Sequence, residues 1–239
     1  DCKYIGTGHY AKIEQDSETG RYLLRKGSDL KKDQSYFLFS LTQSQLKRAI
    51  MPLGSLNKET VRGIARRYKL KTAEKPESQE LCFIADDDYK RFLKDRIPEQ
   101  IQKGEIIDQN GEKLGHHKGI PFYTVGQRRG LGIAVGEPIY VTEIKTETNT
   151  IVVGQADELL RESMIVSQLN WISFENLTEP IRAKIKIRYR DQGEMATATP
   201  TADGKVKVIF DQPRRAIAPG QAAVFYDRDL VIGGGWIEA

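Results

Sequence analysis

One of the two cysteines in this chain lies where a substrate could reach its thiol. Cys82 follows Pro76, Glu77 and Ser78, which favour turns and loops, and sits in the short apolar run 81–84. The spacing predicts a loop-to-strand junction at Cys82. A thiolate there could react with that substrate as a nucleophile. The alternative is an inert packed side chain, because cysteine is among the most frequently buried residues.

A second candidate is the Gly8-His9 pair, in a turn that follows the strand expected near the start of the chain. Ligands of open α/β sheets bind beyond the carboxyl ends of strands. Gly8 has no Cβ and would let a ligand approach the backbone closely, beside the ring of His9. The same residues also fit a plain strand-to-loop turn with a surface histidine.

The clearest charge pattern lies in residues 181–190. Alternate side chains of a strand share one face, and here that face would carry only cations. They are Arg182, Lys184, Lys186, Arg188 and Arg190. Cations would then recur about every 6.6 Å, a spacing suited to a polyphosphate backbone. The alternative is the wet face of an ordinary strand.

Helices are expected between these sites. Thr42 and Gln45 have the capping-box spacing, which predicts a helix running to about Met51. Asn57 should cap a second helix, with one apolar and one basic face; the basic face is either a solvated surface or RNA-facing. An aspartate, Asp86 or Asp87, should cap a third.

From about residue 157 onward the sequence is typical of short strands separated by turns, which predicts a small barrel or sandwich. A hairpin is also expected around residues 18–20. The fold class is therefore α/β plus all-β.

The composition limits the cellular compartment and the partners that we expect for this chain. No apolar run approaches the roughly 20 residues that a membrane-spanning helix needs, so we expect no membrane partner. Two cysteines far apart give no disulfide framework, which favours a reducing cytoplasm. The net charge of +4 is too small to indicate nucleic-acid binding by itself, so the clustering of cations matters more.

Seven ordered motifs resemble those of the tRNA-specific 2-thiouridylase family and extend over nearly the whole chain. They are residues 6–10 (GTGHY), 32–37 (KDQSYF), 72–76 (TAEKP), 78–84 (SQELCFI), 123–132 (YTVGQRRGLG), 188–190 (RYR) and 219–226 (PGQAAVFY). One such string would be weak, but the ordered set is specific.

The resemblance implies an enzyme that uses ATP, with Mg expected, to activate the C2 oxygen of the tRNA wobble uridine by adenylation. Sulfur from a cysteine persulfide then replaces that oxygen. A persulfide carrier or a cysteine desulfurase would donate the sulfur. No tightly bound metal is implied. The target base must leave its stack to be reached, which requires a firm grip on the surrounding RNA.

The resemblance also implies roles for individual residues. Cys82 matches the persulfide-bearing cysteine, Gly8 the glycine beside the ATP site, and His9 its tRNA-contacting neighbour. The remaining tRNA contacts implied by the family are Lys32, Asp33, Gln34, Arg188, Tyr189 and Gln221.

The sequence departs from the family pattern in one respect. It has no Ser-Gly-Gly-x-Asp-Ser phosphate loop, and Cys2 does not match the family's other catalytic cysteine. We therefore expect a C-terminal portion of the enzyme that is inactive alone. The resemblance implies three parts: the end of a Rossmann-like nucleotide-binding domain in residues 1–88, a small central domain in 89–156 and a C-terminal, tRNA-binding β-barrel in 157–239. The helices near 43–69 would pack either within the first part or with the central domain. Two other hypotheses remain: a non-enzymatic RNA-binding module with a translation-factor-like barrel, and a Cys2–Cys82 redox pair.

Overall fold

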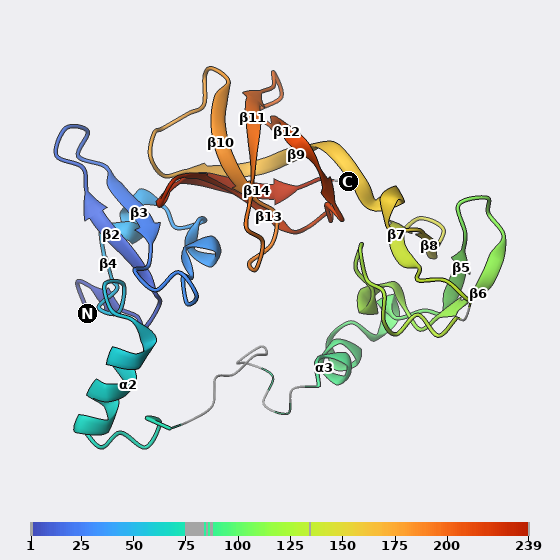
Figure 1. Ribbon diagram of the computed structural model, residues 1–239, viewed down its shortest axis with the longest axis horizontal. Coiled ribbons are helices and arrows are strands. Elements are labelled where there is room, and N and C mark those ends of the chain that lie inside the picture. The colour runs from blue at the N-terminus through green and yellow to red at the C-terminus, as the bar shows by residue number, and fades with distance from the viewer. Residues whose placement is uncertain (1, 75–83, 85, 87, 134, 239) are drawn as a thin grey trace. The chain divides into compact units, whose positions relative to one another are not determined.

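The computed structural model describes residues 2–74, 84, 86, 88–133 and 135–238. Cys82, and with it the expected loop-to-strand junction, lies outside these residues. The chain divides into two compact units (Figure 1). Unit 1 contains residues 1–75, 162–212 and 219–239, and unit 2 contains residues 76–161 and 213–218.

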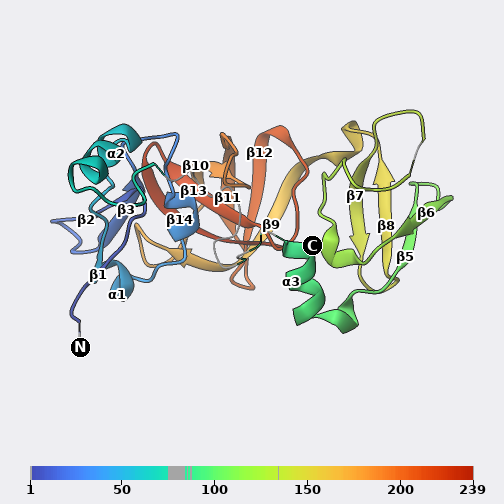
Figure 2. The same ribbon diagram turned by 90° about the horizontal axis from the view of Figure 1, so that it is seen from below.

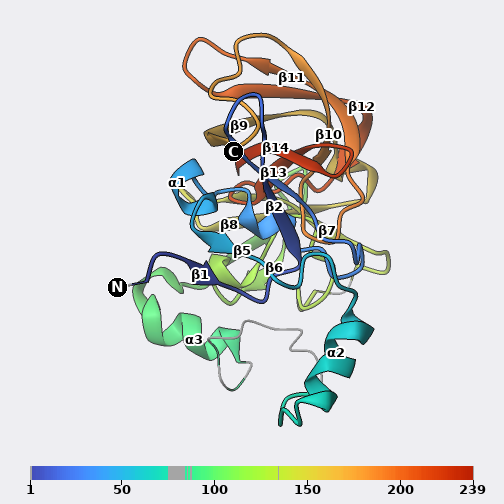
Figure 3. The same ribbon diagram turned by 90° about the vertical axis from the view of Figure 1, so that its left-hand side faces the viewer.

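Six strands of the C-terminal half form a closed barrel (Figure 3). They are β9 (Leu160–Trp171), β10 (Ile181–Lys186), β11 (Glu194–Pro200), β12 (Val206–Arg215), β13 (Ala222–Asp227) and β14 (Leu230–Ile237). The order is β13-β10-β11-β12-β9-β14, and β14 pairs back with β13. Closure leaves no unpaired edge around the ring. The expected barrel is confirmed.

The expected hairpin around residues 18–20 is present and extends the barrel sheet. Strands β2 (Ala11–Gln15) and β3 (Tyr22–Lys26) pair with each other, and β3 pairs with β14. Leu24 of β3 is fully buried in the same hydrophobic core as Val224 of β13 and Val231 of β14. The hairpin therefore shares its hydrophobic core with the barrel, whereas we expected it to belong to the nucleotide-binding portion. The domain boundaries at 88 and 156 stay a prediction.

The rest of the N-terminal segment holds a short parallel pair, β1 (Ile5–Gly6) with β4 (Ala49–Ile50), and two helices, α1 (Gln43–Leu46) and α2 (Lys58–Arg67). The capping box of Thr42 with Gln45 is confirmed. The expectation that this helix runs to about Met51 was wrong, because the chain leaves the helix to pair β4 with β1.

Helix α2 begins after Asn57, whose side chain accepts a hydrogen bond from Thr60 N, as expected. None of its residues is buried, and the expected apolar face is open in part, with Ile64 and Tyr68 exposed. Figures 1 and 3 show α2 extending away from the strands of its unit.

Unit 2 holds a four-stranded sheet in the order β6-β5-β8-β7 (Figure 2). The strands are β5 (Gly104–Ile107), β6 (Lys113–His117), β7 (Tyr140–Lys145) and β8 (Thr150–Gly154), preceded by α3 (Tyr89–Arg96). Ile106, Val141 and Ile151 are fully buried in a separate core.

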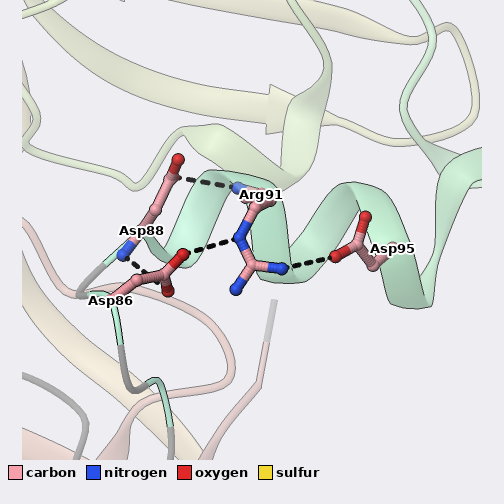
Figure 4. Close-up of polar contacts among 4 residues, drawn as sticks. All are labelled: Asp86, Asp88, Arg91 and Asp95. Carbon is pink, nitrogen blue, oxygen red and sulfur yellow. Dashed lines mark hydrogen bonds and ion pairs between the residues drawn. The ribbon is translucent and has the colours of Figure 1, made fainter.

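The cap of α3 differs from the expectation. Asp88 accepts the hydrogen bond from Arg91 N at 3.0 Å, whereas Asp86 pairs with the Arg91 guanidinium at 2.7 Å (Figure 4). Asp95 completes the pairing of Arg91 at 2.9 Å. The Asp86 carboxylate also accepts a hydrogen bond from Asp88 N at 3.4 Å but none from a backbone N–H within α3, and Asp87 lies outside the described residues.

None of the helices that the structure describes combines the length and apolar character required to cross a membrane.

Candidate nucleic-acid interface

The loop of Lys32, Asp33 and Gln34 lies between β3 and a short 3₁₀ helix (Ser35–Leu38) of unit 1. Asp33 is buried, and its carboxylate accepts hydrogen bonds from Gly27 N (3.0 Å), Ser35 N (3.1 Å) and Ser35 Oγ (2.9 Å). A buried carboxylate needs such donors to offset its lost hydration. Asp33 therefore fixes the loop from inside, and Lys32 is half-buried.

Gln34 joins this loop to the segment that carries Gly8 and His9. Its side-chain Oε1 accepts a hydrogen bond from Tyr10 N at 3.1 Å, and its backbone N donates to Tyr10 O at 2.9 Å. Two candidate segments separated in sequence thus lie side by side.

The 3₁₀ helix is fastened to barrel strand β13. The Tyr36 hydroxyl donates to Ala222 O at 2.9 Å, next to Gln221, and Ser35 Oγ lies 3.2 Å from the Tyr226 hydroxyl oxygen. Burial raises the pKa of Tyr36 to about 12 and also raises that of Tyr226. The side chain of Gln221 itself is exposed.

Tyr189 contacts the same helix from the turn after β10. Its ring centroid lies 4.5 Å from that of Phe37 and 6.3 Å from that of Tyr36. Lys186 Nζ lies 5.7 Å from the Tyr36 centroid and 6.0 Å from the Tyr189 centroid. Arg188 is close enough to lower the pKa of Tyr36, against the larger effect of burial. The expected contacts in 32–34 and 188–189 therefore belong to one surface.

The expected row of cations is only partly correct. Strand β10 ends at Lys186, where Asp191 Oδ2 accepts from Ile187 N at 3.0 Å and draws the chain into a turn. Arg188 and Arg190 therefore do not continue the strand face. The alternating cations alone predict a strand that continues to residue 190. The hydrogen bond from Ile187 N to the Asp191 carboxylate ends that strand earlier.

Arg182 remains on the strand but is engaged. Its guanidinium makes two hydrogen bonds to Asp211, at 2.6 and 2.5 Å, and thereby holds the pKa of that carboxyl below its usual range. Such bidentate pairs are the strongest of the exposed kind. Arg182 is consequently a poor candidate for a phosphate contact.

Lys26 is a further cation close to Lys184 and Lys186, although it lies outside the predicted row. Its Nζ lies 4.4 Å from the Tyr226 ring centroid. Burial, and to a smaller extent the charge of Lys184, lowers the pKa of Lys26. Burial, and to a smaller extent the charges of Lys26 and Lys184, lowers the pKa of Lys186. Sequence reasoning missed Lys26, because it comes from a hairpin with no expected connection to the barrel. It also missed Phe37, whose only signal was its position beside residues 32–34.

The backbone near Gly8 is open. A Cβ on Gly8 would meet only Leu53 Cδ1, at 3.7 Å, so the described packing does not require glycine there. Gly8 is exposed, and His9 Nδ1 lies 2.7 Å from Thr7 Oγ1. The described residues leave the Gly8 backbone exposed, and the ATP contact expected there stays a prediction.

Three family models cover the chain in order. They are a tRNA methyl transferase HUP domain (residues 1–86), a tRNA methyl transferase PRC-barrel domain (90–155) and an aminomethyltransferase beta-barrel domain (161–237). With the closed barrel, they define a three-part protein with a Rossmann-like HUP portion, a central domain and a C-terminal barrel. The expected fold class is confirmed.

Similar curated proteins bear one name, tRNA-specific 2-thiouridylase MnmA. The relative from Carboxydothermus hydrogenoformans is 49% identical over 235 residues, which cover 98% of this chain and 64% of the relative. One from Thermoanaerobacter sp. (strain X514) is 50% identical over 238 residues, 100% of this chain and 65% of the relative. One from Caldanaerobacter subterraneus subsp. tengcongensis is 51% identical over 235 residues.

This chain belongs to the tRNA-specific 2-thiouridylase family. The chain covers slightly less than two thirds of the length of the relatives from Carboxydothermus hydrogenoformans and Thermoanaerobacter sp..

Proposed function

We propose that the protein containing this chain is a tRNA-uridine 2-sulfurtransferase, which replaces the C2 oxygen of the wobble uridine with sulfur. The observation that carries the proposal is identity of about half the residues, along the whole chain, to proteins named tRNA-specific 2-thiouridylase. A purely RNA-binding module would account for the barrel but not for likeness through all three parts.

Cys82 is the sulfur carrier in this proposal. Its thiolate takes the terminal sulfur of a donor persulfide, on a carrier protein or a cysteine desulfurase, and the donor leaves as a thiolate. The outer sulfur of the resulting persulfide attacks C2 of the activated uridine, and the oxygen leaves with AMP. The thiol of the second cysteine that the resemblance implies then attacks the Cys82 sulfur and breaks the S–S bond. The 2-thiouridine keeps the transferred sulfur, and the disulfide that remains is reduced by a cellular thiol. A reducing cytoplasm keeps such a thiol available.

The C2 oxygen is a poor leaving group unless it is activated. ATP, with Mg²⁺, supplies that activation when bound, and the exposed backbone at Gly8 is the part of this chain that would lie against the nucleotide. The phosphate-binding and second-cysteine functions are not provided by the described residues, so the chain alone should be inactive.

The surface around residues 32–37 and 186–189 would hold the tRNA. His9, Lys32, Arg188, Tyr189 and Gln221 contribute side chains that are exposed or half-buried. Asp33 and Gln34 act through the loop that they fix. Cations and aromatic rings together suit an RNA whose bases are splayed from their stack.

Persulfide formation tests the sulfur step separately from the RNA. The 239-residue chain is incubated with a cysteine desulfurase and cysteine, alkylated and digested, and its cysteine peptides are weighed. We expect one added sulfur on the Cys82 peptide, lost in Cys82→Ser and retained in the matched control Cys2→Ser, since Cys2 is the other cysteine of the chain and its thiol is exposed. Sulfur on Cys2 instead, or on neither, would refute the assignment.

A further inference from the structure

Phe37 is an apolar ring left largely in solvent. It is 54% exposed, although the residues on both sides of it, Tyr36 and Leu38, are buried. One part of its ring packs on Tyr189, with centroids 4.5 Å apart and planes inclined by 36°. An edge contact with Tyr36 at 5.5 Å completes its aromatic contacts among the described residues. The remainder of the ring faces no aromatic partner.

The backbone that carries this exposed ring is tied down by hydrogen bonds on both sides of the loop. Phe37 N donates to Gln34 O at 3.0 Å, and the adjacent Tyr36 is anchored by its hydroxyl to Ala222 O. A ring presented from a fixed backbone loses little conformational freedom when a ligand stacks on it. A single exposed apolar side chain on a flexible loop would lose more conformational freedom on binding.

One lysine lies beside the aromatic group, and two more lie near that lysine. Lys186 is close to Tyr36 and Tyr189, and the charges of Lys26 and Lys184 both act on Lys186. Partial burial lowers the pKa of Lys186 and of Lys26, so both ammonium groups lack part of their hydration. An anion placed beside them would replace the lost hydration and relieve their mutual repulsion.

We propose that the Phe37–Tyr189 pair is a stacking platform for one unpaired nucleobase of RNA, with Lys26, Lys184 and Lys186 contacting the neighbouring phosphates. Aromatic rings interleaved with cations are the combination by which proteins hold single-stranded nucleic acid. A protein partner would use the apolar ring but leave the three lysines without a role. The identity of the RNA as tRNA rests on the proposed function.

The test uses a tRNA anticodon stem-loop in which 2-aminopurine replaces, one at a time, each unpaired base. Stacking on an aromatic ring changes 2-aminopurine emission. For the 239-residue chain we expect a change at one loop position, lost in Phe37→Leu and retained in Phe37→Trp, with affinity for the stem-loop lowered roughly tenfold by Phe37→Leu. Tyr4→Leu is the matched control, because Tyr4 is 49% exposed in the same unit.

The outcomes separate the two proposals. If the stem-loop binds and no loop position responds to Phe37→Leu, or if Tyr4→Leu has the same effect, the platform is refuted while tRNA binding stands. If the chain binds an unrelated single strand as tightly as the stem-loop, with the Phe37-dependent signal, the platform stands and tRNA as its ligand fails. Urea unfolding of each variant confirms that the fold is retained.

Discussion

At the scale of single residues, the loop after β3 shows how a side chain can serve a binding surface without pointing toward the ligand. The Asp33 carboxylate is directed inward and is occupied by three donors from Gly27 and Ser35. Its negative charge also lies near Lys26 and Lys186, where it raises their pKa against the larger opposing effect of burial. Asp33 thus sets both the shape and the charge of the surface.

Replacing Asp33 tests this inward role. Asp33→Ala should destabilise unit 1 by about 3 kcal/mol, because it leaves buried donors without an acceptor. Asp33→Asn, which keeps an amide oxygen for the two backbone N–H groups, should cost clearly less. Urea unfolding measures both, with Lys31→Ala, an exposed neighbour, as the control. Equal stability of Asp33→Ala and the wild type would contradict the assignment.

Tyr36 gives a pH-dependent prediction. Its folded-state pKa is raised from 10.0 to about 12 by burial, so the native state holds the phenol proton more tightly than the unfolded state does. The corresponding stability is complete below pH 10 and is lost as the pH rises toward 12. Tyr36→Phe should therefore be about 1 kcal/mol less stable at pH 7, through loss of the bond to Ala222 O, and should show a weaker alkaline decline.

Chemical unfolding of both proteins at pH 7 and across the alkaline range measures this difference. Parallel declines in the two proteins between pH 10 and 12 would show that other groups dominate.

Some residues of this surface could be predicted from the sequence, and others could not. Residues 32–34 and 188–189 could be chosen from motif resemblance, and the structure brings them together through Tyr36 and Tyr189. Lys26 and Phe37 could not, because their relevance depends on pairing between β3 and β14 and on the fastening of residues 35–38 to β13. Cys82, the most important candidate, lies outside the described residues and stays a prediction.

At the scale of elements, strand β10 shows the limit of reasoning from alternation. The alternation predicted a strand from residue 181, which is correct, and Ala183 and Ile185 on its other face are buried. It did not reveal that the strand ends at Lys186, nor that Arg182 is paired across the sheet with Asp211. Of the expected row, Lys184 and Lys186 stay on the strand without such a pairing to Asp211, and Arg188 lies in the turn that follows.

Salt dependence distinguishes these cations. Lys184→Gln and Lys186→Gln should each lower tRNA affinity and reduce the slope of log affinity against log salt by about 1, as expected for one lost phosphate contact. Arg182→Gln should leave the slope unchanged, since its guanidinium is already engaged. Binding titrations over a range of salt concentrations measure the slopes. An Arg182→Gln slope as reduced as that of Lys184→Gln would restore the original row.

Strand β14 and helix α2 each contain a glycine, and the two glycines differ in how much space surrounds them. A Cβ on Gly234 would lie 2.5 Å from Phe39 Cδ2 and 2.8 Å from Ala223 O, whereas a Cβ on Gly63 would meet nothing within 4 Å. Gly234→Ala should destabilise the barrel by about 2 kcal/mol through overpacking. Gly63→Ala should stabilise by about 0.5–1 kcal/mol through helix propensity. Thermal and urea unfolding compare the pair, and a neutral Gly234→Ala would refute the close packing.

At the scale of the whole molecule, the chain combines two separately cored units, and every described candidate residue lies in unit 1. The sequence indicated the three-part composition, which the family models confirm. It did not indicate that residues 11–26 share a core with the barrel. That shared core is what places the 32–37 loop against the turn at 188–189.

The central claim is that Cys82 delivers sulfur to tRNA, and nucleoside analysis tests it most directly. Cells lacking the endogenous protein receive the full-length protein that contains this chain, as wild type, Cys82→Ser or the control Cys2→Ser. Their tRNA is digested and 2-thiouridine nucleosides are quantified by mass spectrometry. We predict that wild type and Cys2→Ser restore 2-thiouridine and that Cys82→Ser, present at equal abundance, does not. Restoration by Cys82→Ser would contradict the account.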